Sequence, residues 1–352
     1  MGLLFLLLVF AFAAGAVWVA GIGLSNTTDV LSMRLGLGEA LGGLILLATT
    51  TNLPEIAITV SAALHHALGI AIGNILGGIA IQTVVLVLLD VFGLGRRTSL
   101  TYQAASLLLV LEGGLVVAVL VVAVMGTQLP SSLTTARLEP ASVAIVVLWL
   151  LGLWLLGRAR KGLPWHEQGV APGGQEQPMG HRKVMKAKHA DERRAGTGKA
   201  VTVFVGASVI TLVGGVVLER SGEKIAGHLH MTGVLFGATV LAAATALPEV
   251  STGLASVKLG DYQLAVSDIF GGNAFLPVLF LVASLLSGSA VLPQAQATDI
   301  YLTGLGVLLT VVYVFGLIFR PRRQIARMGL DSFAVLVIYA IGIAGLVAIA
   351  RS

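Results

Sequence analysis

Ten stretches of mostly apolar residues follow one another along the chain, separated by short polar or charged segments. A helix needs roughly 20 apolar residues to cross about 30 Å of hydrocarbon. The stretches are continuously apolar and lack the alternation of a barrel strand, which favours helices. We therefore predict an all-α polytopic membrane protein with ten transmembrane helices, at residues 3–23, 36–63, 67–92, 100–125, 140–157, 200–219, 232–257, 262–287, 298–319 and 329–350.

The composition agrees with a membrane protein. Hydrophobic residues make up 56% of the 352 residues and charged residues only 11%, with a mean hydropathy of +0.95. Soluble domains carry about 25% charged residues. The chain contains no cysteine, which excludes disulfides and thiolate metal sites.

The Lys and Arg residues of the loops gather on one side of the predicted spans. If the N-terminus lies outside, 18 of the 22 basic residues fall in cytoplasmic loops, ten of them between Arg158 and Lys199. The positive-inside rule thus favours a multi-pass protein of the cell membrane with both termini outside. The net charge of +5 follows from this bias. The expected partner at this point is therefore the lipid bilayer, and no nucleic acid is needed to explain the charge.

The basic segment at 158–199 separates two sets of five spans. Its Pro, Gly and Gln residues indicate a solvated cytoplasmic linker. We expect a first five-span repeat at 1–157 and a second at 200–352.

An internal repeat is the strongest signal in the sequence. Residues 41–80 align with 235–274 at a constant offset of 194, with thirteen identities in forty positions. Thr-x-Leu-Pro-Glu occurs at 51–55 and again at 245–249, and both copies continue to a matched Gly-Gly pair. Five spans separate the copies, so the copies must cross the bilayer in opposite directions. Inverted repeats of this kind are typical of secondary transporters, whose site lies near the midplane where the copies meet.

The Pro-Glu pairs predict a polar site inside the membrane. Pro248 removes a backbone donor and leaves carbonyls near Ala244 and Thr245 without helical partners. Such carbonyls are costly in hydrocarbon unless they line a polar cavity. With hydroxyls and a carboxylate, they offer the oxygen ligands that hard cations prefer. A proline kink whose glutamate is satisfied by a neighbouring helix is the alternative, and it explains one copy better than two. The same argument applies to Ala48, Thr50, Thr51 and Glu55.

These residues resemble the calcium/cation antiporters, the superfamily that includes the sodium/calcium exchangers. That family carries Gly-Thr-Ser-Leu-Pro-Glu in one helix and Gly-Asn-x-x-Gly-Ser-Asn in the next, once in each of two alpha-repeats. The first motif region here, 48–82, contains Thr-Thr-Asn-Leu-Pro-Glu and Gly-Asn-Ile-Leu-Gly-Gly. The second, 242–276, contains Ala-Thr-Ala-Leu-Pro-Glu and Ser-Asp-Ile-Phe-Gly-Gly.

The resemblance implies a role for each matched position. Glu55 and Glu249 would be the central cation ligands, and the first and sixth spans would move against an eight-helix core. The other positions that it implies in cation binding are the hydroxyls of Thr51 and Thr245, the carbonyls of Ala48 and Ala242, and the side chains of Asn52, Asn74, Gln82 and Asp268.

The chain also departs from the family pattern. Oxygen ligands are missing where the family would hold sodium, so we expect fewer bound ions than in a typical sodium/calcium exchanger. Asp268 lies two turns, or about 12 Å, before Leu276 and cannot replace the lost carboxylate. The departures are Asn52 and Ala246 in place of Ser, Gly78 and Gly272 in place of hydroxyl residues, Gln82 in place of Asn, and Leu276 where many sodium-coupled members have Asp.

We expect a secondary active antiporter, without a cofactor, that exchanges Ca²⁺ for Na⁺ or H⁺ by alternating access. Glu55 and Glu249 balance one divalent cation, and protons could replace it on the same carboxylates, so both coupling ions stay open. Mn²⁺, Mg²⁺ or a monovalent ion would also accept these oxygens. A passive cation channel could use the same ligands. An intramembrane enzyme is not expected, because the spans contain neither His-Glu-x-x-His nor Gly-x-Ser-x-Gly.

Glu112 and Asp90 are further carboxylates within the predicted spans. Glu112, in the fourth span, is a candidate proton relay, with a structural contact to a neighbouring helix as the alternative. Asp90 lies near the cytoplasmic end, and we expect it to form a salt bridge with Arg96 or Arg97.

Overall fold

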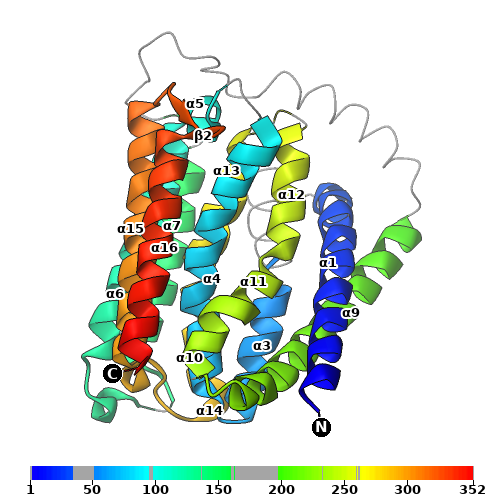
Figure 1. Ribbon diagram of the computed structural model, residues 1–352, viewed down its shortest axis with the longest axis vertical. Coiled ribbons are helices and arrows are strands. Elements are labelled where there is room, and N and C mark those ends of the chain that lie inside the picture. The colour runs from blue at the N-terminus through cyan, green and yellow to red at the C-terminus, as the bar shows by residue number, and fades with distance from the viewer. Residues whose placement is uncertain are drawn as a thin grey trace.

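The computed structural model shows a bundle of long helices (Figure 1). It describes residues 2–34, 51–94, 98–135, 137–159, 162, 197–231, 233–258, 260 and 262–351. Within these ranges eight helices are long and apolar enough to cross a membrane, and a bent helix pair brings the number to nine. The predicted span 36–63 is described only from Thr51 onward, so the count of ten stays a prediction. The chain is a multi-pass membrane protein.

Short helical segments alternate with the long helices along the chain. The first half contains α1 (Leu3–Arg34), α3 (Leu53–Leu64), α4 (Leu68–Leu89) with the π-helix η2 (Asp90–Leu94), α5 (Leu100–Ala104), α6 (Leu107–Thr127), η3 (Ser131–Leu133) and α7 (Pro140–Ala159). The second half contains α9 (Thr197–His228), α10 (Gly233–Phe236), the π-helix η4 (Gly237–Leu241), α11 (Ala242–Thr245), α12 (Leu247–Lys258), α13 (Tyr262–Phe275), η5 (Leu276–Val278), α14 (Leu279–Ser287), η6 (Leu292–Gln294), α15 (Ala297–Phe319) and α16 (Leu330–Arg351). A short antiparallel hairpin of β1 (Gln324–Ile325) and β2 (Met328–Gly329) precedes α16.

The structure corrects three of the predicted bounds. The spans expected at 3–23 and 200–219 continue as helix to Arg34 and His228, because a polar segment ends an apolar run without ending the helix. The span expected at 100–125 is broken between α5 and α6. Ser106 is extended at this break, and its hydroxyl accepts a hydrogen bond from the Leu108 N–H at 3.2 Å, which caps α6.

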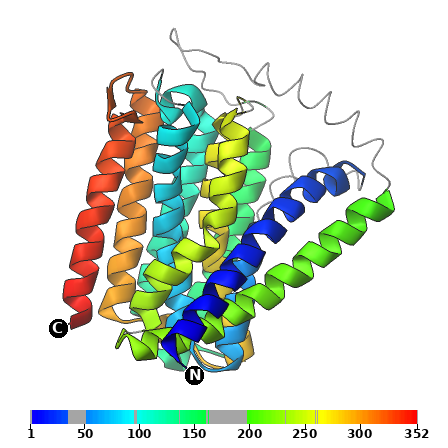
Figure 2. The same ribbon diagram turned by 45° about the vertical axis from the view of Figure 1, so that its right-hand side comes forward.

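The repeat is visible in the bounds of the helices. A shift of 194 residues converts α1 into α9 and α3 into α12, and it brings the start of α4 onto the start of α13. Helices α1 and α9 lie side by side and run in opposite directions (Figures 1 and 2). The correspondence ends at Pro277, which stands in place of Thr83 and interrupts the helix with the 3-10 turn η5.

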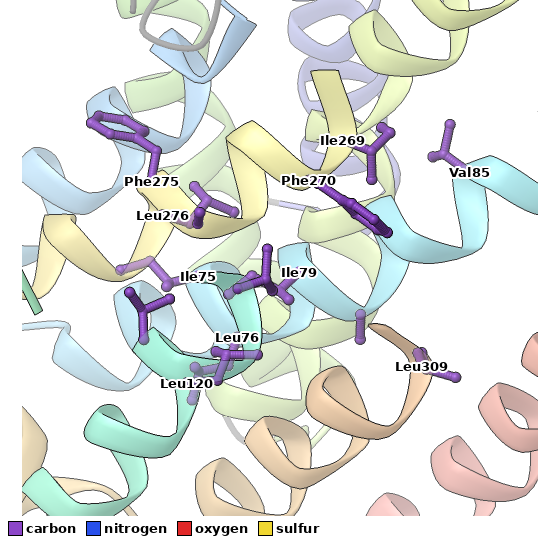
Figure 3. Close-up of a cluster of buried hydrophobic side chains, with 14 of the residues drawn as sticks. Ile75, Leu76, Ile79, Val85, Leu120, Ile269, Phe270, Phe275, Leu276 and Leu309 are labelled. Atoms are coloured by element: carbon purple, nitrogen blue, oxygen red, sulfur yellow. The ribbon is translucent and has the colours of Figure 1, made fainter. Parts of the chain in front are cut away.

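Two packing units divide the molecule. Helices α4 and α13 lie at the centre of the larger unit with α6 and α15, and Figure 3 shows Ile79, Phe270 and Leu276 within its core. Helices α1 and α9 lie together at one side of the bundle (Figures 1 and 2), and their Val17 and Leu218 belong to a second apolar cluster that also includes Ile58 of α3.

Both ends of the chain lie toward the same end of the bundle, as the predicted orientation requires (Figures 1 and 2). The assignment of that end to the outside stays a prediction.

Candidate cation-binding site

Each Leu-Pro-Glu block begins a new helix. Asn52 precedes α3 with φ −90° and ψ 13°, and its counterpart Ala246 separates α11 from α12 with φ −76° and ψ −4°. The proline is the second residue of its helix, where its missing N–H would have no intrahelical partner anyway. In the second copy the chain bends by 42° between the helical segments on either side of Ala246. The glutamate lies in the first turn, where free backbone N–H groups favour an anion.

Of the two carbonyls predicted as cation ligands, only that of Ala242 belongs to a described residue. The Ala242 carbonyl accepts hydrogen bonds from the Ala246 N–H at 3.0 Å and the Thr245 hydroxyl at 3.2 Å. Its use as a cation ligand stays a prediction. Ala48 and Thr50 lie outside the described residues.

The two glutamates come together from opposite copies of the repeat. Both are buried, with exposed fractions of 0% for Glu55 and 2% for Glu249. The Thr245 hydroxyl of the second copy lies close to the Glu55 carboxylate, and Glu249 lies within electrostatic range of Glu55. Gln82 of the first copy donates from Nε2 to Glu249 Oε1 at 3.4 Å. Four residues predicted from the sequence therefore share one buried region.

Gly272 leaves space beside two buried amides. A Cβ atom at this position would lie 3.2 Å from Asn52 Nδ2 and 3.5 Å from Gln82 Oε1. Its counterpart Gly78 instead faces the Leu276 side chain at 3.5 Å. The region is thus polar beside Gly272 and apolar beside Gly78.

Asn273 belongs to the same region but was not predicted from the sequence. This side chain is fully buried in α13 and donates from Nδ2 to Thr83 Oγ1 at 3.1 Å and to the Ile79 carbonyl at 3.4 Å. Ile79 is its counterpart in the repeat, so the hydrogen bond joins equivalent positions of the two copies. Comparison of the two copies selects only positions with the same residue in both, and this position is Asn in one copy and Ile in the other. The available signal was the last Asn of the family motif Gly-Asn-x-x-Gly-Ser-Asn, which Asn273 matches directly after the second Gly-Gly pair.

Three more predicted ligand positions have different surroundings. Asp268 is half-buried, accepts a hydrogen bond from the Thr252 hydroxyl at 3.2 Å and lies within electrostatic range of Glu249. Asn74 is fully buried in α4, where its backbone packs against Gly237, and its amide makes no hydrogen bond to a described residue. Thr51 is buried directly before the break in the first copy.

Glu112 lies apart from the paired glutamates. It is buried on α6 and lines a small cavity together with Trp149, Phe270 and Gly271. Its role as a proton relay stays a prediction. Among the described residues, no three His, Asp or Glu side chains are grouped as metal ligands.

Comparison with known families decides where the chain belongs. The sequence profile described as "Sodium/calcium exchanger protein" matches residues 5–157 and 199–348. The chain belongs to this family. The resemblance inferred from the Leu-Pro-Glu and Gly-Gly motifs is thereby confirmed.

Relatives of this sodium/calcium exchanger family member include bacterial membrane proteins. The Inner membrane protein YrbG of Escherichia coli K12 is 25% identical over 292 residues, which cover 82% of this chain and 81% of that one. The Putative antiporter CaxA of Alkalimonas amylolytica is 29% identical over 101 residues, or 29% of this chain and 32% of that one.

Solved structures show the same fold. The H⁺/Ca²⁺ exchanger CAX has a TM-score of 0.67 at 13% identity, with 98% of this chain and 87% of that one covered. The sodium-calcium exchanger NCX_Mj, soaked with 2.5 mM Na⁺ and 0.1 mM Ca²⁺, has a TM-score of 0.59 at 18% identity, with 97% of this chain and 98% of that one covered.

Proposed function

We propose that this family member is a secondary active cation antiporter that exchanges Ca²⁺ for Na⁺ or H⁺ at a midplane site formed by Glu55 and Glu249. The proposal includes ten spans in two inverted five-span repeats, 1–157 and 200–352, with a cytoplasmic linker at 158–199 and both termini outside. The observation that carries it is the meeting of two buried glutamates from opposite copies, each in the first turn of a helix that starts at a break.

Charge balance supports a cation at this position. An uncompensated buried carboxylate costs several kcal/mol, and two close together cost more. A divalent cation offsets both charges at once. The Thr245 hydroxyl and the amide oxygens of Asn52 and Gln82 can complete its oxygen shell, with Thr51 and the carbonyls of Ala48 and Ala242 as further ligands.

The unequal halves of the site support exchange of few ions. Gly78 in the first copy, and Ala246 and Leu276 in the second, place no side-chain oxygen where the family pattern would hold additional sodium ions. Protonation of the two glutamates would release a divalent cation without extra ligands. Both H⁺ and Na⁺ therefore remain in the proposal, as do Mn²⁺, Mg²⁺ and monovalent ions in place of Ca²⁺.

The packing of α1 and α9 supports alternating access. A Cβ added at Gly21 on α1 would lie 2.9 Å from the Pro248 ring, and one at Gly215 on α9 would lie 3.1 Å from the Pro54 carbonyl. Gly21 and Gly215 are themselves 194 residues apart. Each of the two outer helices thus contacts the helix break of the opposite copy, where a sliding movement would open or close the site.

A flux matrix on purified protein in proteoliposomes tests the proposal. Labelled Ca²⁺, Mn²⁺ and a monovalent ion are each offered under an imposed outward Na⁺ or H⁺ gradient. We expect Ca²⁺ accumulation against its own gradient under at least one of the two. Uptake that only dissipates the Ca²⁺ gradient would indicate a passive channel instead.

Substitution of the glutamates tests the site. Glu55→Gln and Glu249→Gln should each lower Ca²⁺ exchange about 100-fold or more. Each change removes one carboxylate from a buried carboxylate–cation pair, and breaking a buried pair of opposite charges costs about 3–5 kcal/mol. Glu223→Gln, an exposed change on α9, is the matched control and should leave exchange unchanged. Exchange that survives both Glu55→Gln and Glu249→Gln would refute the site.

A further inference from the structure

A second pair of buried carboxylates lies far from the glutamates, at the end of the bundle that carries the β1–β2 hairpin (Figure 1). Asp90 is the first residue of η2, directly after α4, and Asp331 is the second residue of α16. Their exposed fractions are 0% and 6%. The pair therefore combines a residue from each half of the chain.

Asp90 is held firmly by backbone donors. Its Oδ1 accepts from the Leu100 N–H at 2.8 Å, and its Oδ2 accepts from the Gly329 N–H at 2.6 Å. The Ser332 hydroxyl lies close to the same carboxylate. These contacts join the end of α4 to α5 and to the hairpin. The expected partners Arg96 and Arg97 lie outside the described residues, so that salt bridge stays a prediction.

Asp331 is buried without a well-aligned hydrogen bond to a described residue. The Thr101 hydroxyl, which is 1% exposed and equally without such a bond, lies close to it. Two glycines make room for the Asp331 carboxylate, because a Cβ at Gly316 or at Gly329 would collide with it.

The two carboxylates converge on one point. A Cβ at Gly329 would meet Asp331 Oδ1 and would also lie 3.3 Å from Asp90 Oδ2. Both side chains therefore direct an oxygen into the same space beside the Gly329 backbone, and Thr101 borders that space from α5. Oxygens from both halves of the chain thus border one space.

The described groups that contact the two carboxylates carry no positive charge. They are backbone N–H groups and the hydroxyls of Thr101 and Ser332. The guanidinium group of Arg322 lies instead over the Tyr102 ring, 5.3 Å from its centre. The N-terminus of α16 offsets roughly half an elementary charge. Among the described residues, most of the negative charge of the pair therefore has no cationic partner in direct contact.

We propose that Asp90, Asp331 and Thr101 bind a hard cation, Ca²⁺ or Na⁺, at a site separate from the Glu55–Glu249 pair. Carboxylate and hydroxyl oxygens are the ligands that both ions accept. A bound cation bridges η2 and α5 of the first half to α16 of the second. The cation thereby stabilises the contact between the two halves of the chain at the end of the bundle where the β1–β2 hairpin lies.

Binding measurements on the full-length protein in detergent test this site. The starting protein carries Glu55→Gln and Glu249→Gln, so the central pair no longer contributes. Equilibrium dialysis with labelled Ca²⁺, and the change in melting temperature with Ca²⁺ or with Na⁺, are measured on it. We expect about one Ca²⁺ per chain, or, for a Na⁺ site, stabilisation by Na⁺ alone.

The site is then removed in the same background. Asp331→Asn should abolish the binding and the ion-induced rise in melting temperature. Thr101→Val, which keeps the shape of the side chain, should weaken binding several-fold and serves if Asp331→Asn fails to fold. Asp299→Asn is the matched control, because Asp299 is also a buried carboxylate near a helix start and accepts from the Gln296 N–H at 2.7 Å. It should leave binding unchanged.

Two outcomes overturn the proposal. One is that the starting protein binds neither ion. The other is that the Asp331→Asn and Thr101→Val variants bind the ion as the starting protein does. Either result leaves the proposed exchange at Glu55 and Glu249 intact, because that is read from transport by proteins with an intact Asp90–Asp331 pair.

Discussion

Gly272 shows how one missing side chain shapes the candidate site. In the family pattern this position carries a hydroxyl. In this chain it is a glycine, and the amides of Asn52 and Gln82 border the space. The counterpart position, Gly78, is bordered by the apolar Leu276. A hydroxyl restored at the two glycines would therefore meet different surroundings, polar at one and apolar at the other.

Gly272→Ser should increase the competition of Na⁺ with Ca²⁺. The new hydroxyl adds one oxygen ligand among polar neighbours, and the Asn52 amide needs to shift by only a few tenths of an ångström. One such interaction is worth about 1 kcal/mol, or roughly a fivefold lower Na⁺ concentration for half-inhibition of Ca²⁺ uptake. Gly78→Ser is the control and should give no such gain. An equal response of both variants would count against the unequal site.

Among single residues, the sequence identified those candidate site residues that occur in both copies of the repeat. Glu55, Glu249 and Thr245 were found because each has an identical counterpart 194 residues away, and the structure brings these three together. Asn273 was missed because its counterpart, Ile79, is apolar. A side chain at the contact between two copies needs to be polar on one side only, so duplication is an incomplete guide there.

At the scale of elements, apolar runs predicted the presence of helices better than their ends. The span expected at 262–287 has these bounds, because Gly260 precedes it and Gly288 ends it in the left-handed region with φ 75°. Helices α1 and α9 extend beyond their apolar runs because water also supports a helix. The break between α5 and α6 could not be predicted, because it contains neither Pro nor Gly and depends on the Ser106 cap.

Gly77 and Gly271 occupy equivalent positions but should tolerate change differently. A Cβ at Gly77 would collide with the Ala238 backbone, whereas at Gly271 no described atom lies within 4 Å. Gly77→Ala should therefore force α4 away from η4 and cost about 1–3 kcal/mol or more. Gly271→Ala should be neutral or stabilising by about 0.4–1 kcal/mol, because alanine restricts the unfolded chain. Melting temperatures of the two variants in detergent measure the difference, and equal values would contradict it.

At the scale of the whole molecule, the two packing units suggest how exchange is organised. Helices α4 and α13 carry Gln82 and Asn273 of the candidate site, whereas α1 and α9 lie to one side of them (Figure 2). Their contact with the rest of the bundle includes two equivalent glycines, Gly21 and Gly215, placed against the two helix breaks. Because glycines permit close backbone approach, any side chain added at these two positions would alter how the outer helices pack against the helix breaks.

Gly21→Ala and Gly215→Ala should slow exchange without abolishing cation binding. Each added methyl group meets the opposite helix break, 2.9 Å from the Pro248 Cβ or 2.6 Å from the Ala57 Cβ, and so disfavours this arrangement of the outer helices. An overpacking cost of about 1–3 kcal/mol corresponds to roughly a 5- to 150-fold change in the balance between conformations. Exchange rates in proteoliposomes should fall, while Ca²⁺ affinity in detergent changes less than the rate does. Gly206→Ala, at a position on α9 with no neighbour within 4 Å among the described residues, is the control. If all three variants exchange at the same rate, the glycine contacts do not limit the movement; if affinity and rate fall together, the glycines support the site itself rather than its opening.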